Sequence, residues 1–374
     1  MQNKLSVYSF VILIMKKIAF LLLLWSAAPA VFSQNCLTYY FDQYNQFYIY
    51  DNGNTIQAEP IAPKNIKVGR NTLAYTTNLG RMKLYFNGKT YPIAEIECPY
   101  YMTDNWFVYR NFGLLGVLYN NELKILDKLA TDSMFFVSDS LITWSTAIND
   151  QKIFYKGEVI QLERWPVNSA KISDNILAYT TNEQNFKVFY QGEKTVLEGY
   201  EPANYIVNRD IVVYEDYYGT YKVFYKGKTY QTSTIVQKNN YWVGEDFFAY
   251  YNQQGQLNVW YEGEETTICQ DQTKTLTINE NMIVFGDKAN NFWCWYKGNL
   301  KLIERYIPTD YKVDNDILVY RDLYGTLYGY YFGEKVKISD QIPKSYILSN
   351  YTVAYTVAEG ETRIWCKNKI VSVR

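Results

Sequence analysis

The sequence predicts an all-β repeat protein, and three features of the chain carry this prediction. The first is a strand-and-turn pattern, clearest over residues 204–231, where segments rich in β-branched and aromatic residues alternate with breaks of Asn, Asp and Gly. The second is the return of this unit about every 35 residues along the chain. The third is a glycine two residues after the third segment of most copies.

Each repeat unit contains four short segments that we expect to be strands. In residues 204–231 the predicted strands are Tyr205–Val207, Ile211–Glu215, Tyr221–Tyr225 and Lys228–Gln231. An aromatic residue near the end of the second segment marks ten copies, at spacings of 34 to 36 residues: Tyr40, Tyr75, Tyr109, Trp144, Tyr179, Tyr214, Tyr250, Phe285, Tyr320 and Tyr355. The chain is therefore expected to hold about ten similar units.

The recurring glycine predicts a tight hairpin between the third and fourth strands of each unit. Glycine adopts positive φ without steric cost, as such hairpin turns require. It is found at Gly88, Gly157, Gly192, Gly227, Gly263, Gly298 and Gly333.

The second and third strands are apolar on both faces, since Ile176 and Ala178 alternate with Leu177 and Tyr179. A strand buried on both faces needs a layer on each side of its sheet. This predicts a β-propeller of about ten four-stranded blades with a 35-residue repeat; a β-solenoid and an open arc of blades are the alternatives. The first copy begins at its second strand, near Leu37, so we expect nine complete blades and a first blade without its inner strand.

The pattern resembles the WD40-like and TolB-like propeller repeats. The shared features are a turn of the Ser173-Asp174-Asn175 type, an aliphatic–Tyr second strand and an outer hairpin. The Trp-Asp dipeptide of WD40 repeats and the proline of the TolB-like turn are absent. The resemblance implies the fold and transfers no functional residue.

Residues 1–33 have the pattern of a signal peptide. Lysines at 16 and 17 precede the apolar run Ile18–Trp25, and Val31-Phe32-Ser33 offers a cleavage site. The run is far shorter than the roughly 20 residues of a membrane-spanning helix, which disfavours the alternative of a retained anchor. We expect residues 34–374 to form a single exported domain, periplasmic or extracellular and associated with the cell envelope, with no transmembrane segment after cleavage.

Composition excludes several kinds of chemistry. The chain has no histidine, which removes Ser-His-Asp triads and His-containing metal sites, and its net charge of −1 gives no basic surplus for nucleic acid. The five cysteines include no C-x-x-C pair, and we expect neither a metal nor a cofactor. A Cys36–Cys366 disulfide that joins the first and last blades is one hypothesis for ring closure.

Carboxylates in the turns between second and third strands are the candidates for catalysis. Asp216, Asp287 and Asp322 could serve a carbohydrate-active hydrolase if two of them met at the ring mouth. Other copies carry Thr, Ser or Asn in these turns, so a solvated turn residue is the alternative and favoured interpretation.

The connectors between blades contain prolines and aromatic residues, a composition typical of rigid contact loops. We predict binding through Tyr100, Tyr101, Trp165, Tyr200 and Tyr306, with packing between blades as the alternative role. The predicted function is a non-catalytic module that binds or scaffolds an envelope or extracellular protein, with a glycan as the second candidate partner. The hydrolase is the alternative function.

Overall fold

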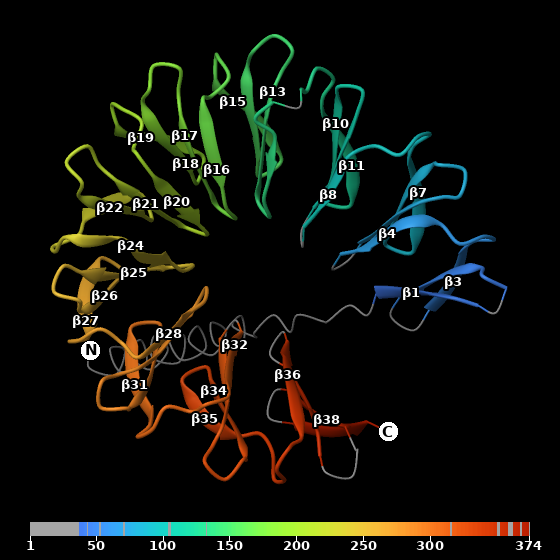
Figure 1. The fold of residues 1–374 in the computed structure, drawn as a ribbon. Helices are drawn as coiled ribbons and strands as arrows, with labels where there is room; N and C mark the ends of the chain where they lie inside the picture. The colour runs from blue at the N-terminus through green and yellow to red at the C-terminus, as the bar shows by residue number, and fades with distance from the viewer. Residues whose placement is uncertain are drawn as a thin grey trace, which may run out of the picture. The chain divides into compact units, whose positions relative to one another are not determined.

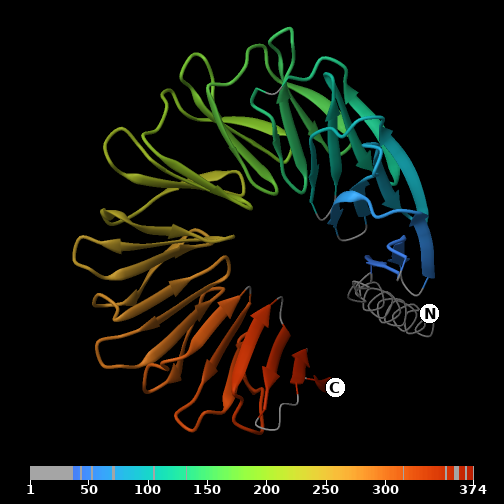
Figure 2. The same cartoon turned by 45° about the vertical axis from the view of Figure 1, so that its right-hand side comes forward.

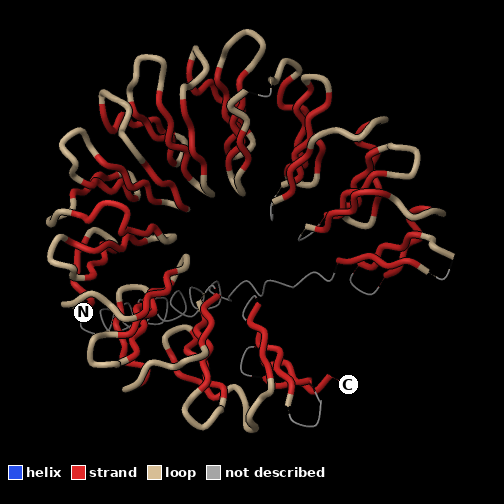
Figure 3. Tube along the Cα trace, in the orientation of Figure 1, coloured by secondary structure: helices blue, strands red, loops and turns tan. Residues whose placement is uncertain are grey.

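The structure, a computed structural model, describes residues 37–42, 44–51, 54–69, 72–103, 106–131, 133–314, 316–349, 352–357, 362–366 and 369–373. Within these ranges the regular secondary structure is entirely β-strand, as Figure 3 shows. The chain divides into two compact units, Met1–Cys98 and Pro99–Arg374.

The first unit contains two antiparallel sheets. One has three strands, β1 (Leu37–Phe41), β2 (Phe47–Asp51) and β3 (Asn54–Glu59). The other has four strands, β4 (Lys64–Val68), β5 (Thr72–Thr76), β6 (Met82–Phe86) and β7 (Lys89–Ala94).

The second unit contains eight four-stranded sheets, and the first four cover residues 100–231. They are β8 (Tyr100–Met102), β9 (Phe107–Asn111), β10 (Leu114–Tyr119) and β11 (Glu122–Asp127); β12 (Phe136–Val137), β13 (Leu141–Ser145), β14 (Gln151–Tyr155) and β15 (Glu158–Glu163); β16 (Ser169–Ile172), β17 (Ile176–Thr180), β18 (Phe186–Tyr190) and β19 (Glu193–Glu198). The fourth is β20 (Tyr205–Asn208), β21 (Ile211–Glu215), β22 (Tyr221–Tyr225) and β23 (Lys228–Gln231).

The remaining four sheets follow the same order of strands. They are β24 (Val236–Val243), β25 (Phe247–Asn252), β26 (Leu257–Tyr261) and β27 (Glu264–Cys269); β28 (Thr275–Ile278), β29 (Met282–Gly286), β30 (Phe292–Tyr296) and β31 (Asn299–Glu304). The last two are β32 (Tyr311–Asp314), β33 (Ile317–Arg321), β34 (Leu327–Tyr331) and β35 (Glu334–Lys337); and β36 (Ser345–Ser349), β37 (Thr352–Thr356), β38 (Thr362–Cys366) and β39 (Lys369–Val373).

Within the second unit the sheets succeed one another as the blades of a propeller. In Figure 1 the first strands of the blades, such as β16, β20 and β32, lie innermost, and the fourth strands, such as β19 and β31, lie outermost. Figure 2 shows neighbouring sheets of this unit side by side, with their faces turned toward one another.

The sequence pattern sets these strands almost residue by residue. Three of the four strands predicted in residues 204–231 have the observed bounds, and the first extends one residue further, to Asn208. The hairpin between third and fourth strands has two consecutive residues at positive φ, for example Lys226 at 48° and Gly227 at 83°. This is the backbone of a type I′ turn, whose twist matches that of the flanking strands. The predicted hairpin is confirmed.

The core lies between neighbouring sheets and not in one central mass. Val212 and Tyr214 of β21, for instance, pack against Ile176 and Ala178 of β17. Both faces of the second and third strands are buried in this way, as the doubly apolar sequence requires.

A hydrogen-bonded link between sheets recurs beside this core. Glu163, at the end of β15, accepts hydrogen bonds from the hydroxyl of Tyr179 (2.9 Å) and the ammonium of Lys187 (3.0 Å) in the next sheet. The same link joins Glu198 to Tyr214 and Lys222. In the first unit it joins Glu59 to Tyr75 and Lys83. The marker tyrosine of the repeat therefore fills the core with its ring and ties two blades together with its hydroxyl.

The predicted architecture is confirmed: among the described residues there are nine four-stranded sheets and a first sheet of three strands. Every strand pair in the described part of the chain is antiparallel, which excludes the β-solenoid alternative. The signal peptide over residues 1–33 and the pairing of Cys36 with Cys366 lie outside the described residues. The single domain over residues 34–374 and ring closure stay predictions. No helix in the described part of the chain is long and apolar enough to cross a membrane.

Candidate functional site

In each blade of the second unit, the turn between second and third strands and the connectors to neighbouring blades share one face. We call it the turn face. In several blades the connector residue two places after the fourth strand contacts the turn of the next blade. The hydroxyl of Tyr200 accepts a hydrogen bond from the backbone N–H of Tyr217 (2.9 Å), and Asp271 forms an ion pair with Lys288 (2.7 Å). Connector and turn therefore form one continuous, braced surface.

The three candidate catalytic carboxylates are the caps of these turns. One oxygen of Asp216 accepts hydrogen bonds from the backbone N–H groups of Tyr218 and Thr220, both at 2.9 Å. Asp322 and Asp287 occupy the same place in their own turns. Each of the three stands in a different blade.

The environment of Asp287 favours its ionised form. Burial would raise its pKa, but hydrogen bonds from the indole of Trp293 (2.9 Å) and from Asn291 outweigh burial and hold the pKa below its usual value. A carboxylate held ionised in this way is suited to accept hydrogen bonds, and is poorly suited to act as a general acid near neutral pH.

Threonine and asparagine perform the same task in other blades. The hydroxyl of Thr146 accepts from the N–H of Asp150 (3.1 Å), and Asn252 accepts from the N–H groups of Gln254 and Gln256. The turn thus requires a side-chain oxygen and not a charge, which explains the variation among copies. In the described residues no group of three or more His, Cys, Asp or Glu side chains could hold a metal ion.

The five predicted aromatic anchors have different surroundings. Tyr100 and Tyr101 lie in the inner strand β8 and not in a connector, which corrects their predicted place; Tyr101 is half-exposed and its ring contacts Phe135. Trp165 lies in the connector between β15 and β16 and is 63% exposed. Tyr200 and Tyr306 are half-buried.

Tyr200 and Tyr306 serve as braces of the turn face. The ring of Tyr200 meets that of Tyr217 edge-on at 6.2 Å, in addition to the hydrogen bond already described. Burial raises the pKa of the Tyr306 hydroxyl, which also forms a hydrogen bond with the backbone of Leu323. The hydroxyls of Tyr200 and Tyr306 are thus already hydrogen-bonded within the protein. The two turns that they brace present other side chains to solvent.

The turns between second and third strands hold the most exposed large apolar side chains of the described chain. The seven highest values, from 74% to 95%, all belong to turns between second and third strands: Tyr44 and Leu79 in the first unit, and Phe112, Tyr217, Tyr218, Leu323 and Tyr324 in the second. We call the latter five the turn-face rim. Connectors add Ile96, Trp165, Ile235 and Ile342. Sequence reasoning missed the rim; its signal was the pair of apolar residues inside otherwise polar breaks, Tyr217-Tyr218 and Leu323-Tyr324.

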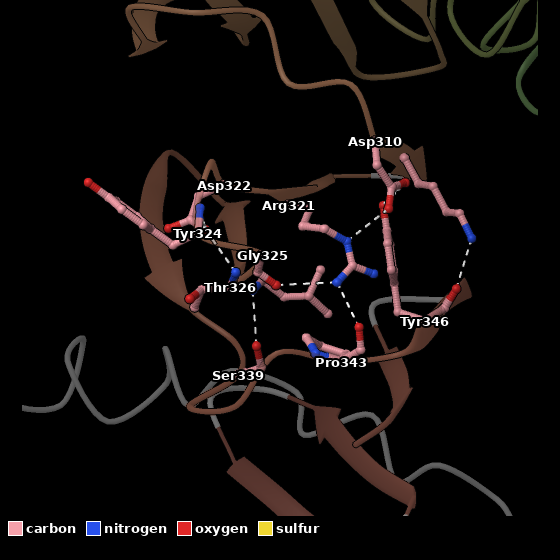
Figure 4. Close-up of polar contacts among 11 residues, drawn as sticks. Asp310, Arg321, Asp322, Tyr324, Gly325, Thr326, Ser339, Pro343 and Tyr346 are labelled. Atoms are coloured by element: carbon pink, nitrogen blue, oxygen red, sulfur yellow. Dashed lines mark hydrogen bonds and ion pairs between the residues drawn. The ribbon is translucent and has the colours of Figure 1, made fainter. Parts of the chain in front are cut away.

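An arginine fixes the turn face of blade β32–β35. In Figure 4 the guanidinium of Arg321 reaches Asp310 (3.2 Å) on one side and donates to the carbonyls of Gly325 (3.2 Å) and Pro343 (2.7 Å) on the other. The hydroxyl of Tyr346 donates to the same Asp310 (2.9 Å). One side chain thus holds the incoming connector, the turn and the outgoing connector.

The same device recurs in blade β8–β11. Arg110 donates to the carbonyl of Thr131 in the outgoing connector (3.0 Å) and lies over the ring of Phe135, 5.2 Å from its centroid. Arg321 therefore holds the exposed turn at Leu323-Tyr324 directly, and Arg110 fixes the connector that is hydrogen-bonded to the turn of Phe112. Rigid, exposed aromatic residues are effective binding contacts because little conformational entropy is lost when they bind.

The stacked antiparallel sheets and the braced turn face define a protein of the β-propeller class. The chain belongs to the 10-bladed beta propeller domain family, whose model matches residues 31–370. No curated protein matches the sequence.

Several solved structures are similar to this chain at low identity. The computationally designed Ika8 protein is 14% identical with a TM-score of 0.27, over 80% of this chain and 95% of that one. The tricorn protease is 10% identical with a TM-score of 0.27, over 89% of this chain and 46% of that one. PorZ, a bacterial surface component of the type-IX secretion system of Porphyromonas gingivalis, is 7% identical with a TM-score of 0.27, over 83% of this chain and 52% of that one. The chain spans about half the length of the latter two, and these similarities carry no argument about function.

Proposed function

We propose that this β-propeller is an exported, non-catalytic module that binds or scaffolds an envelope or extracellular protein through its turn face. The carrying observation is the turn-face rim, in which apolar side chains stand in solvent on turns held by hydrogen bonds. Apolar residues exposed singly are normal on protein surfaces. A set that recurs at the same place of three blades of the second unit forms a patterned surface suited to a partner.

Two further features support this proposal. The rim is built mainly of tyrosine, which combines a large apolar contact area with a hydroxyl for hydrogen bonds and loses few rotamers on binding. The leader pattern of residues 1–33 supports an exported, periplasmic or extracellular location. Tyr100, Tyr101, Trp165, Tyr200 and Tyr306 stay proposed contributors, with Trp165 and Tyr101 as the direct contacts and Tyr200 and Tyr306 as supports.

No observation favours the hydrolase alternative. Asp216, Asp287 and Asp322 each cap a separate turn, and Asn or Thr fills their place elsewhere. A pair of hydrolytic carboxylates must face one substrate bond from about 5 to 10 Å apart.

The test is a capture experiment. The protein is expressed from its full-length sequence in the cells it comes from, and the envelope proteins that purify with it are identified. A rim variant carries Tyr217→Ser, Tyr218→Ser, Leu323→Ser and Tyr324→Ser. A control variant carries four apolar-to-serine changes on exposed outer strands: Leu123→Ser, Val159→Ser, Val196→Ser and Leu300→Ser. Quantitative mass spectrometry after cross-linking is the readout.

The proposal expects at least one protein that the parent and the control capture equally and the folded rim variant captures at least tenfold less. Capture that is equal for all three proteins would overturn the turn-face proposal. Circular dichroism and unfolding midpoints show that the rim variant is folded, since exposed substitutions usually change stability by less than about 0.5 kcal/mol.

A further inference from the structure

A cleft of about 520 Å³ lies on the turn face where blade β12–β15 meets blade β16–β19. Its lining is polar except for one indole and one aliphatic residue, and includes Glu163, Arg164, Trp165, Thr181, Asn182 and Lys194. All of these residues belong to the second unit. The cleft is separate from the tyrosine-bearing turns at 217–218 and 323–324.

At the cleft Trp165 forms no hydrogen bond to the neighbouring turn. In the next blade Tyr200, at the same place of the repeat, is tied to the backbone of Tyr217, and further along Asp271 is tied to Lys288. Trp165 and Asn182, which lies in the corresponding turn, both line the cleft, but in the described chain the indole N–H of Trp165 donates no hydrogen bond. The ring is 63% exposed and forms one wall of the cleft.

Hydrogen-bonding groups of both kinds line the other walls. Glu163 offers a carboxylate that already accepts from Tyr179 and Lys187, so its position is fixed. Lys194 donates to the carbonyl of Leu162 (2.9 Å) and retains further N–H donors. Asn182 and the neighbouring Gln161 add amides, each of which donates and accepts.

A buried hydroxyl in the wall of the cleft has no partner. Thr181 is 8% exposed, and among the described residues its side-chain oxygen forms no hydrogen bond. At the same place of other turns, Thr146 and Thr77 accept the N–H of the residue four positions on. An unpaired buried hydroxyl costs free energy, which a ligand hydroxyl that reaches Thr181 after rotation of its χ1 would recover.

We propose that this cleft binds a sugar ring, as one residue of a glycan. The exposed indole can stack on the C–H face of a pyranose, because the face of an aromatic ring is electron-rich and the C–H bonds are weakly positive. Fixed carboxylate, amide and ammonium groups around it can pair with the hydroxyls on the ring edge. Each sugar hydroxyl can both donate and accept a hydrogen bond, and this lining offers partners for both. The lining suits a phosphate less well, because Lys187 is already paired with Glu163, and the carboxylates of Glu163 and Glu183 offset two of the three cations Arg164, Lys187 and Lys194.

The test is binding of the purified chain to a printed array of neutral, amino-sugar and uronic-acid glycans, followed by calorimetry with the best-retained glycan. Trp165→Ala removes the stacking surface, and Trp165→Phe keeps part of it. Ile235→Ala is the control, because Ile235 is also an apolar residue in a connector between a fourth strand and the next blade and is 62% exposed.

The proposal expects the parent and Ile235→Ala to retain the same glycans with equal affinity. Trp165→Ala should weaken binding at least tenfold, and the affinity of Trp165→Phe should lie between those of the parent and Trp165→Ala. The bound sugar should shift tryptophan fluorescence only in the proteins that retain Trp165. Retention of no glycan above the Trp165→Ala background would overturn the proposal, as would binding of oligothymidine in preference to every glycan. The rim variant should retain glycan, so failure of the sugar site and failure of the protein-binding proposal are distinguishable.

Discussion

Leu318 and Leu323 stand five residues apart in blade β32–β35 and have opposite surroundings. Leu318, in β33, is fully buried against Met282 and Val284 of the preceding blade, whereas Leu323, in the adjoining turn, is 74% exposed. The contrast teaches that each blade is built from two kinds of position. Strand positions are set by packing against the neighbouring blades, and turn positions carry apolar residues that nothing within the described chain covers.

The same division separates what repeats from what varies. The strand core keeps an aliphatic–aromatic pair in nearly every copy, because each blade must fit both of its neighbours. The turn face requires only one capping oxygen per turn, so the residues beside the cap are free to differ. Leu323-Tyr324, Tyr217-Tyr218 and Asn182-Glu183 occupy equivalent places. These exposed places therefore differ from blade to blade.

The largest expected effect tests the buried side of the comparison. Leu318→Ala should lower the free energy of unfolding by about 2–5 kcal/mol, because it leaves a cavity between two sheets. Leu323→Ala, the same substitution in the same blade, should change it by less than about 0.5 kcal/mol. Denaturant unfolding followed by tryptophan fluorescence is the measurement. Equal losses for the two variants would contradict the division into strand and turn positions.

Alkaline pH should weaken the links between blades. Burial, followed by the hydrogen bond from its hydroxyl to Glu304 (2.6 Å), raises the pKa of Tyr320 above its ordinary value. Burial, followed by the hydrogen bond to Asp51, raises the pKa of Tyr85 to about 12.

A pKa that is higher in the folded chain than in the unfolded one means that the folded chain holds the proton more tightly. This stabilisation is complete below the ordinary tyrosine pKa of about 10 and is lost as the pH rises through the folded value. Unfolding midpoints should therefore fall between about pH 10 and about pH 12. Tyr320→Phe should show a shallower fall than the parent, and a parent midpoint that stays constant over this range would contradict the prediction.

The regular part of the molecule could be predicted from the sequence because its physics is local and repeated. Both apolar faces of residues 176–179 require sheets on either side, and the turn at Lys226-Gly227 requires positive φ. Ten copies reinforced each inference, so strands such as Ile211–Glu215 were predicted to the residue. The position of Tyr100 and Tyr101 was predicted wrongly, because a short inner strand after a proline has the composition of a loop.

The sites were harder to predict because they depend on contacts between separate blades. The sequence shows Trp165, Tyr200 and Tyr306 at equivalent places, but not that two are braces while the third stands free beside Asn182. The partner of Tyr200 lies in the following turn, at a residue whose side chain does not take part in the hydrogen bond. Nor does the sequence show that the Thr181 hydroxyl lacks the partner that Thr146 has.

The smallest expected effect concerns the capping residue Asp322. It decides whether this carboxylate only caps its turn or has a functional role that requires its charge. Asp322 accepts hydrogen bonds from the backbone N–H groups of Tyr324 (2.9 Å) and Thr326 (2.8 Å). Asp322→Ala should lower the free energy of unfolding by about 1 kcal/mol, because both donors lose their partner in a largely solvated turn. Asp322→Asn should restore most of this loss, because Asn252 caps its own turn with the same geometry. Thermal unfolding of the three proteins is the measurement. If asparagine proves as damaging as alanine, the turn needs the charge itself, and the carboxylate has a role that hydrogen bonding does not explain.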